Sequence, residues 1–94
     1  MELGTFVVVR TFSAGVHVGT LSVQDGKRVT LTDARRIWRW SGANSLHELA
    51  LAGCDEKYSR ISEPVASIDL AEAIEVLPTT SVAKINLSQS RWPK

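Results

Sequence analysis

The chain has 94 residues and a mass of 10.3 kDa, which fits one domain over residues 1–94 and excludes a multidomain protein. With 44% hydrophobic and 22% charged residues, its composition is that of a folded globular protein and not of a disordered one. The formal net charge of +1 combines six basic against three acidic residues in 1–40 with five against seven in 41–94. This balance excludes a uniformly cationic surface for a long nucleic acid.

The sequence also excludes several kinds of site and location. It has no apolar run of the ~20 residues that a membrane span needs and no basic segment followed by an apolar one at its start, so we expect a cytoplasmic protein with no membrane partner. Cys54 is the only cysteine, and the histidines His17 and His47 stand far apart from each other. An intrachain disulfide is therefore excluded, and we expect neither a metal site nor a cofactor.

Two strands are predicted near the start of the chain. Residues 5–10 form a β-branched and aromatic run bounded by a glycine and by a Ser-Ala-Gly loop, which is typical of a strand. Residues 16–23 predict a second strand, but its apolar positions change from even to odd numbers along the run. Because alternate side chains of a strand face opposite sides, this change predicts a bulge or a sharp coil near Gly19.

A hairpin and a third strand follow. A three-residue loop over 24–26 would place Leu21 opposite Val29 and Gly19 opposite Leu31, which matches the apolar residues better than a two-residue Asp-Gly turn. The third strand is expected over 28–32. Residues 33–40 fit either a helical turn or a fourth strand, and the β-propensity of Ile37 and the two tryptophans favours the strand. Alternation would then place Arg36, Trp38 and Trp40 on one face.

The rest of the chain predicts helices and further core. Ser45 and Glu48 form a capping-box pattern before a short helix with a buried stripe of Leu46, Leu49 and Ala50, which Gly53 should end. Residues 54–64 are polar and predict a surface excursion anchored by Tyr58 and Ile61, while residues 65–77 suit a strand or a helix equally. A weaker helix is expected over 80–87. The expected fold is a small α+β domain: a strongly bent antiparallel sheet, either open or barrel-like, with one short capped helix and a weaker C-terminal one.

Residues 34–40 hold three arginines and two tryptophans in seven positions. Guanidinium groups bind phosphate in planar forks, and indole rings offer flat surfaces on which nucleobases stack. Arg35, Arg36, Trp38 and Trp40 are therefore candidate nucleotide contacts. The plainer structural alternative is that one tryptophan is core, the other covers a sheet edge and the arginines are solvated.

A second candidate segment is the loop 10–16. Its small residues allow close backbone approach, so N–H groups of Ser13, Ala14 and Gly15 could surround an anion, with charge from Arg10. His17 follows directly and could donate to a phosphate, although a structural histidine is the alternative. The loop is not a Walker or dinucleotide-binding motif, because it lies between two strands and has a single glycine. The structural alternative is a plain connection between strands, which needs no ligand. Cys54 has no placeable basic or histidine partner, which is typical of an inert thiol.

No catalytic motif is present: the sequence lacks a Gly-x-Ser-x-Gly elbow, a recognisable pair of catalytic carboxylates and a His/Cys cluster. We therefore expect a binding protein and not an enzyme.

Segments 8–19, 29–40, 41–43, 45–49 and 74–77 resemble a widespread family of small bacteriophage proteins, over nearly the whole chain from about Phe6. That family is associated with the anti-CBASS nucleotide sponges, oligomeric proteins that sequester the cyclic dinucleotide signals of bacterial defence without cleaving them. The resemblance implies a homo-oligomer in the cytoplasm of the infected bacterial cell, with a cyclic nucleotide such as 3′3′-cGAMP bound at subunit interfaces.

Matched motif by motif, the resemblance points to ligand contacts in both candidate segments: Arg10, Thr11, Ser13, Ala14, Gly15, Arg35, Arg36, Trp38 and Trp40. Arg39 departs from the pattern, because a neutral or aromatic residue is usual there, and this leaves the identity of the nucleotide open. A phage adaptor or structural protein that binds a protein partner through Trp38, Trp40 and Trp92 is the alternative function. Weak nucleic-acid binding by the arginine segment ranks third.

Overall fold

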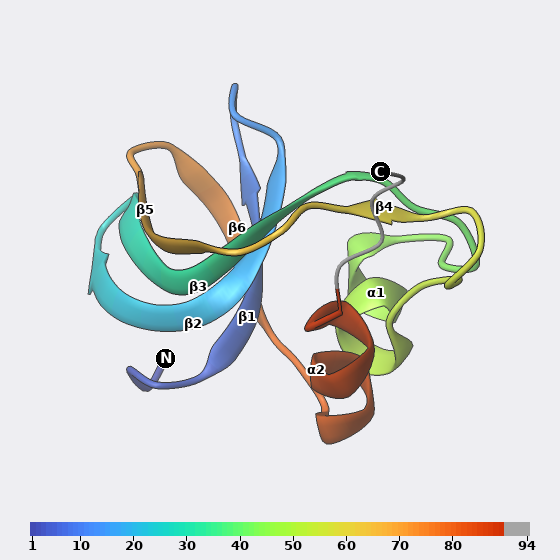
Figure 1. Ribbon diagram of the computed structural model, residues 1–94. Coiled ribbons are helices and arrows are strands. Elements are labelled where there is room, and N and C mark those ends of the chain that lie inside the picture. Colours follow the sequence, from blue (N-terminus) through green and yellow to red (C-terminus); the bar gives the residue numbers. More distant parts are fainter. Residues whose placement is uncertain (90–94) are drawn as a thin grey trace.

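The computed structural model describes residues 1–89 of the chain, which form six strands and two helices (Figure 1). Trp92, one of the three tryptophans of the adaptor hypothesis, lies outside the described residues. In chain order the elements are β1 (Phe6–Thr11), β2 (Val16–Asp25), β3 (Arg28–Arg39), α1 (Leu46–Ala52), β4 (Arg60–Ile61), β5 (Val65–Leu70), β6 (Ala73–Pro78) and α2 (Ser81–Leu87).

The strands form one antiparallel sheet in the order β4-β3-β2-β1-β6, and β5 pairs with another part of β3. Figure 1 shows β2 and β3 curving strongly, while α1 and α2 lie together at one side of the sheet. Residues 71–72 join β5 to β6, but the ladders between the described strands do not include one between these two. The fold is therefore the expected α+β domain with a bent sheet that stays open instead of closing into a barrel.

Strand β1 runs through the middle of the core, because Val7, Val8 and Val9 are all fully buried. Val8 faces the helices and belongs to a helix-side core that includes Val16, Val18, Ile37, Leu49, Ile61, Ala83 and Leu87. Val7 and Val9 face the inside of the curved sheet, where a second core contains Leu21, Val29, Leu31, Ala34, Leu70 and Ala73. The uninterrupted apolar run of β1 follows from this burial on both faces.

The β2–β3 hairpin differs from its predicted register. Its turn has two residues, 26–27, with Gly26 at φ +59°, and Leu21 pairs with Leu31 instead of Val29. Positive φ at the first turn position is what a tight hairpin of this length needs. A register shift between Leu21 and Val23 absorbs the difference, so the apolar match is achieved through a bulge and not through a longer loop.

Strand β3 is one continuous element from Arg28 to Arg39, not a third strand followed by a separate fourth. The predicted irregularity near Gly19 is confirmed by a register shift between Val18 and Thr20. The extra residue on β3 is Asp33, whose φ of +48° is the only positive value among the non-glycine residues 1–89. Gly19 permits the close approach opposite it, since a Cβ there would lie 3.0 Å from the Thr32 carbonyl oxygen.

Helix α1 begins at the predicted cap. The Ser45 hydroxyl accepts a hydrogen bond from the Glu48 amide at 3.3 Å, but the Glu48 carboxylate accepts from the amide of Asn44 at 3.0 Å instead of from Ser45. Leu49 and Ala50 are buried and Leu46 is half-buried. Gly53 ends the helix, as predicted.

Helix α2, predicted over 80–87, spans Ser81–Leu87 and is tied to the end of α1 at two points. Thr80 caps it by accepting from the Ala83 amide at 3.1 Å, and its hydroxyl donates to the Leu51 carbonyl at 2.6 Å. The Asn86 side chain accepts from the Cys54 amide at 2.9 Å and donates to the Cys54 carbonyl at 3.0 Å. The two short helices therefore form one unit.

Residues 65–77 form two strands with a two-residue connection, which settles the alternative between strand and helix. Of the two anchors expected in the segment before them, Ile61 is fully buried in β4 and is confirmed. Tyr58 is 55% exposed and does not anchor the segment. Ser59 is buried instead, and its hydroxyl accepts from the Ser41 amide at 3.2 Å.

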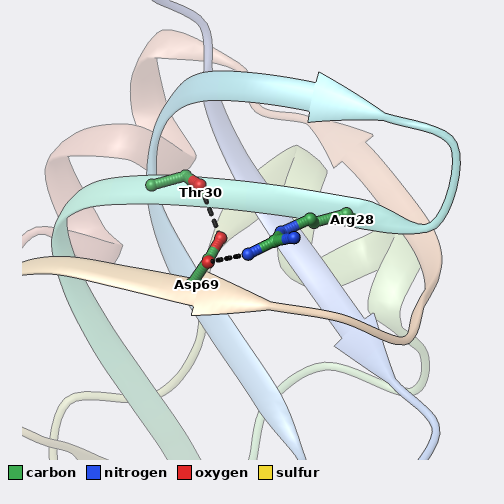
Figure 2. A network of polar contacts seen from close by, with 3 residues as sticks. All are labelled: Arg28, Thr30 and Asp69. Carbon is green, nitrogen blue, oxygen red and sulfur yellow. Dashed lines mark hydrogen bonds and ion pairs between the residues drawn. The ribbon is translucent and has the colours of Figure 1, made fainter.

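An exposed polar cluster joins β5 to β3 (Figure 2). Asp69 accepts hydrogen bonds from Arg28 and from the Thr30 hydroxyl, each at 2.7 Å. These two bonds, the Arg28 bond foremost, lower the pKa of Asp69. Neither helix in the described part of the chain is long and apolar enough to cross a membrane.

Candidate functional site

The first candidate loop is organised by a threonine. Thr11 is buried, and its hydroxyl donates to the Gly15 carbonyl and accepts from the Ala14 amide, both at 2.8 Å. Gly15 has φ +84°, which favours glycine. The Ala14 N–H, predicted to face an anion, is therefore already bonded inside the loop. Among the described residues the amides of Ser13 and Gly15 have no such partner.

His17 supports this loop through a hydrogen bond. It is 3% exposed in β2, and its Nε2–H donates to the Ala14 carbonyl at 2.9 Å. Burial lowers the pKa of His17; the bond to Ala14 opposes that shift and the nearby Arg36 adds to it. The buried ring thus holds the loop in place, which is the structural alternative given for His17.

Two carboxylates, which the sequence interpretation did not include, lie beside the loop. Glu75 accepts from Arg10 Nη1 at 3.1 Å, and Glu72 accepts from the Ser13 hydroxyl at 3.0 Å. Glu75 lies in β6, which pairs with β1, and Glu72 lies in the turn before β6. The Arg10–Glu75 pair is largely exposed, and exposed pairs contribute little stability. An anionic ligand could therefore replace Glu75 as the partner of Arg10 at small cost.

The β2–β3 ladder makes the two candidate segments neighbours. Val16 pairs with Ile37 and His17 with Arg36. The Arg36 guanidinium lies across Gly15, because a Cβ on this glycine would stand 3.0 Å from Arg36 Nη2. A charge from the arginine segment is thus held directly over the loop.

Arg35 and Arg36 are consecutive in β3 and so lie on opposite faces, and the bulge at Asp33 decides which face each of them takes. Arg35 pairs with Val18 and shares the helix-side face with Ile37, which is fully buried. Arg36, paired with His17, lies on the opposite face. The predicted contacts Arg35 and Arg36 are therefore on opposite sides of the sheet.

The tryptophans are separated too, which corrects the predicted alternation. Trp38 lies within β3 and is 51% exposed. The strand ends at Arg39, so alternation does not extend to Trp40, which is half-buried against the helix-side core. There Trp40 and Arg10 line a hollow of about 360 Å³, completed by Val16, Ser45, Leu46, His47 and Glu75. We call it the Arg10–Trp40 hollow.

The structure thus divides the ten predicted contacts among three places. The Arg10–Trp40 hollow holds two of them, and Arg35 belongs to a different hollow near α2. The others lie in or beside the loop: Thr11, Ser13, Ala14, Gly15, His17, Arg36 and Trp38. Cys54 is buried, and no three His, Cys, Asp or Glu side chains within residues 1–89 gather as a metal site.

Fold and site together define a small α+β domain with an open, strongly bent antiparallel sheet, one end of which carries arginine and tryptophan around a glycine loop. Residues 4–87 match the family described as a domain of unknown function (DUF6948), and the chain belongs to that family. No curated protein and no solved structure gave a match to this chain.

Proposed function

We propose that the protein captures a cyclic nucleotide second messenger, such as a cyclic dinucleotide, and holds it without cleaving it. The observation that carries the proposal is that two segments chosen separately, one for phosphate and one for bases, become neighbours at one end of the sheet. Arg10 and Trp40 meet in one hollow, and Arg36 crosses Gly15 on the other face of β3.

The chemistry of these groups suits an anionic ligand with flat rings. Guanidinium forks pair with phosphodiester oxygens, and an indole stacks on a base. A hollow of about 360 Å³ is at the small end of ligand sites, so it would take one nucleotide half of a cyclic dinucleotide. The other half would be held by a second subunit, on the face of β3 where Arg36 crosses Gly15 and Trp38 is exposed.

Exposed apolar side chains in the same two segments support a homo-oligomer with ligand at its interface. Phe12, in the loop, is 76% exposed, and Trp38, in β3, is 51% exposed. Aromatic side chains in such places are typical anchors of subunit contacts. Capture of this kind needs affinity rather than catalysis, and nanomolar binding corresponds to about −12 kcal/mol. Blocking CBASS-type signalling in an infected bacterial cell would be the biological result.

Isothermal titration against cyclic dinucleotides, cyclic trinucleotides and ADP-ribose derivatives tests the proposal. We expect saturable binding of one class and recovery of the intact compound after heat denaturation. Arg36→Ala should lower the affinity at least about tenfold, because charge-assisted hydrogen bonds are lost. Lys27→Ala removes one positive charge from the hairpin turn and serves as the matched control. If no compound binds at micromolar protein, or if the recovered compound is cleaved, the proposal is wrong.

A protein-binding adaptor is the second candidate, favoured by the same exposure of Phe12 and Trp38. It predicts that Trp38→Ala abolishes binding of a protein partner while nucleotides have no effect on that binding. Nucleotide-dependent thermal stabilisation of the isolated protein would decide against it.

A further inference from the structure

A second hollow, of about 400 Å³, lies between the bulge of β3 and helix α2. We call it the Asp33–Lys84 hollow, and its lining is Phe6, Thr20, Asp33, Arg35, Pro64, Lys84 and Ser88. It shares no lining residue with the Arg10–Trp40 hollow. Phe6 and Arg10 lie four residues apart along β1, about 13 Å at the usual rise per strand residue. The two hollows are therefore separate sites.

The strained residue of the sheet lies at this hollow. Asp33 has φ +48°, a conformation that costs a non-glycine residue energy and that Asp and Asn tolerate best. Bulges next to binding sites re-aim side chains, and strained residues gather at ligand sites. Here the bulge places the exposed Asp33 carboxylate at the hollow and turns Arg35 to the same side.

Among the described residues, those that line the hollow carry two positive charges and one negative charge. Arg35 comes from β3, where its Nη1 donates to the Ser62 carbonyl at 3.3 Å, and Lys84 comes from α2. Two cations from different elements suit a phosphate monoester, which carries nearly two negative charges at neutral pH. Asp33 would repel that phosphate, so it requires a ligand whose other end presents hydrogen-bond donors.

The remaining lining residues indicate what joins those two ends. Phe6 is a half-buried aromatic residue and Pro64 an exposed apolar one, and a flat ring can lie against such groups. Thr20 and Ser88 add hydroxyl groups. A volume of about 400 Å³ is within the range of small-molecule sites.

We propose that the Asp33–Lys84 hollow binds a guanine nucleotide, with its phosphate between Arg35 and Lys84 and its base against Phe6. Guanine presents two adjacent N–H donors on one edge, which a carboxylate accepts as a pair. Adenine presents a donor beside an acceptor on the equivalent edge, and that acceptor would face the Asp33 carboxylate. The Asp33 carboxylate thus makes the site favour guanine over adenine.

Titration calorimetry with GMP, AMP and inorganic phosphate tests this inference on the full chain. We expect saturable GMP binding at least about tenfold tighter than AMP binding, as one paired hydrogen-bond contact typically gives. Asp33→Asn keeps a residue that tolerates the positive φ and removes the charge, so it should reduce the GMP preference to near unity. Lys84→Ala, at an exposed position of α2, should weaken both nucleotides, whereas Lys27→Ala should weaken neither.

The inference is wrong if GMP does not saturate at millimolar concentration, if AMP binds equally well, or if Lys84→Ala behaves like Lys27→Ala. If Asp33→Asn does not fold, Lys84→Ala still tests whether the nucleotide binds in this hollow. Arg10→Ala alters only the Arg10–Trp40 hollow and should leave GMP affinity unchanged. Loss of GMP binding in Arg10→Ala but not in Lys84→Ala would place the nucleotide in that hollow, which would overturn this inference and leave the cyclic-nucleotide proposal standing.

Discussion

Replacing Thr11 by valine should destabilise the protein through the loop that it organises. Valine keeps the shape of the buried side chain but loses a hydroxyl that donates to the Gly15 carbonyl and accepts from the Ala14 amide. The Gly15 carbonyl retains its bond from the Thr11 amide at 3.0 Å, whereas the half-buried Ala14 amide loses its partner. One lost bond and one unsatisfied donor together cost about 2 kcal/mol. For a domain of this size the melting temperature should fall by roughly 8–16 °C.

Thr11→Ser is the matched control, because it keeps both hydrogen bonds and removes one methyl group, which is worth about 0.8 kcal/mol. Urea unfolding, followed by tryptophan fluorescence, measures the free energy of unfolding of both variants. We expect the valine variant to be the less stable by about 1 kcal/mol. A valine variant as stable as the serine variant would refute the argument that the hydroxyl holds the loop together.

Three further predictions concern pH, the helix pair and the ligand. His17 has a lowered pKa in the folded protein, so below about pH 6.5 the unfolded chain binds a proton that the folded chain does not. The free energy of unfolding should therefore fall as the pH drops below about 6.5, by up to about 1.4 kcal/mol per pH unit. Urea unfolding of His17→Gln should not show this loss. Asn86→Ala leaves the buried Cys54 amide and carbonyl without these two bonds and should cost about 2–4 kcal/mol, measured by thermal unfolding, with an unchanged midpoint as the contrary result. Arg36→Ala and Trp38→Ala, both at exposed positions, should weaken cyclic-nucleotide binding in calorimetry and leave the circular dichroism spectrum unchanged. A spectrum typical of an unfolded chain would contradict the assignment of both residues to the surface.

Much of the fold follows from local pattern. The structure confirms the apolar run of β1 as a strand and the cap at Ser45. It also has the irregularity predicted near Gly19, although the extra residue lies on β3 and not on β2. Residues 65–77 fit a strand and a helix equally, because their even-numbered apolar residues alternate as in a strand, whereas Asp69 and Glu72 fit a helix cap. Pairing with β3 on one side and β1 on the other decides between them, and no local pattern carries that information.

The hairpin register illustrates a different limit. Matching Leu21 to an apolar partner is correct as a principle, but a bulge achieves the match without lengthening the turn. The sequence also could not place Glu75, Lys84 or Phe6 at a hollow, since these residues come from elements that only the tertiary fold assembles. By contrast, β2 and β3 are consecutive strands joined by a tight hairpin. Their pairing is enough to bring the two candidate segments close together.

Because Asp33 is an extra residue in β3, the number of residues in this strand, and not only their identity, determines which side chains lie on each face of the sheet. Each side chain beyond this residue stands on its side of the sheet because one extra residue is inserted there. Deleting that residue would exchange the sides of Arg35 and Arg36 and bring Ile37 out of the helix-side core, with every remaining amino acid unchanged. Among related chains, a gain or loss of one residue at this point is therefore expected to change ligand preference more than most substitutions would.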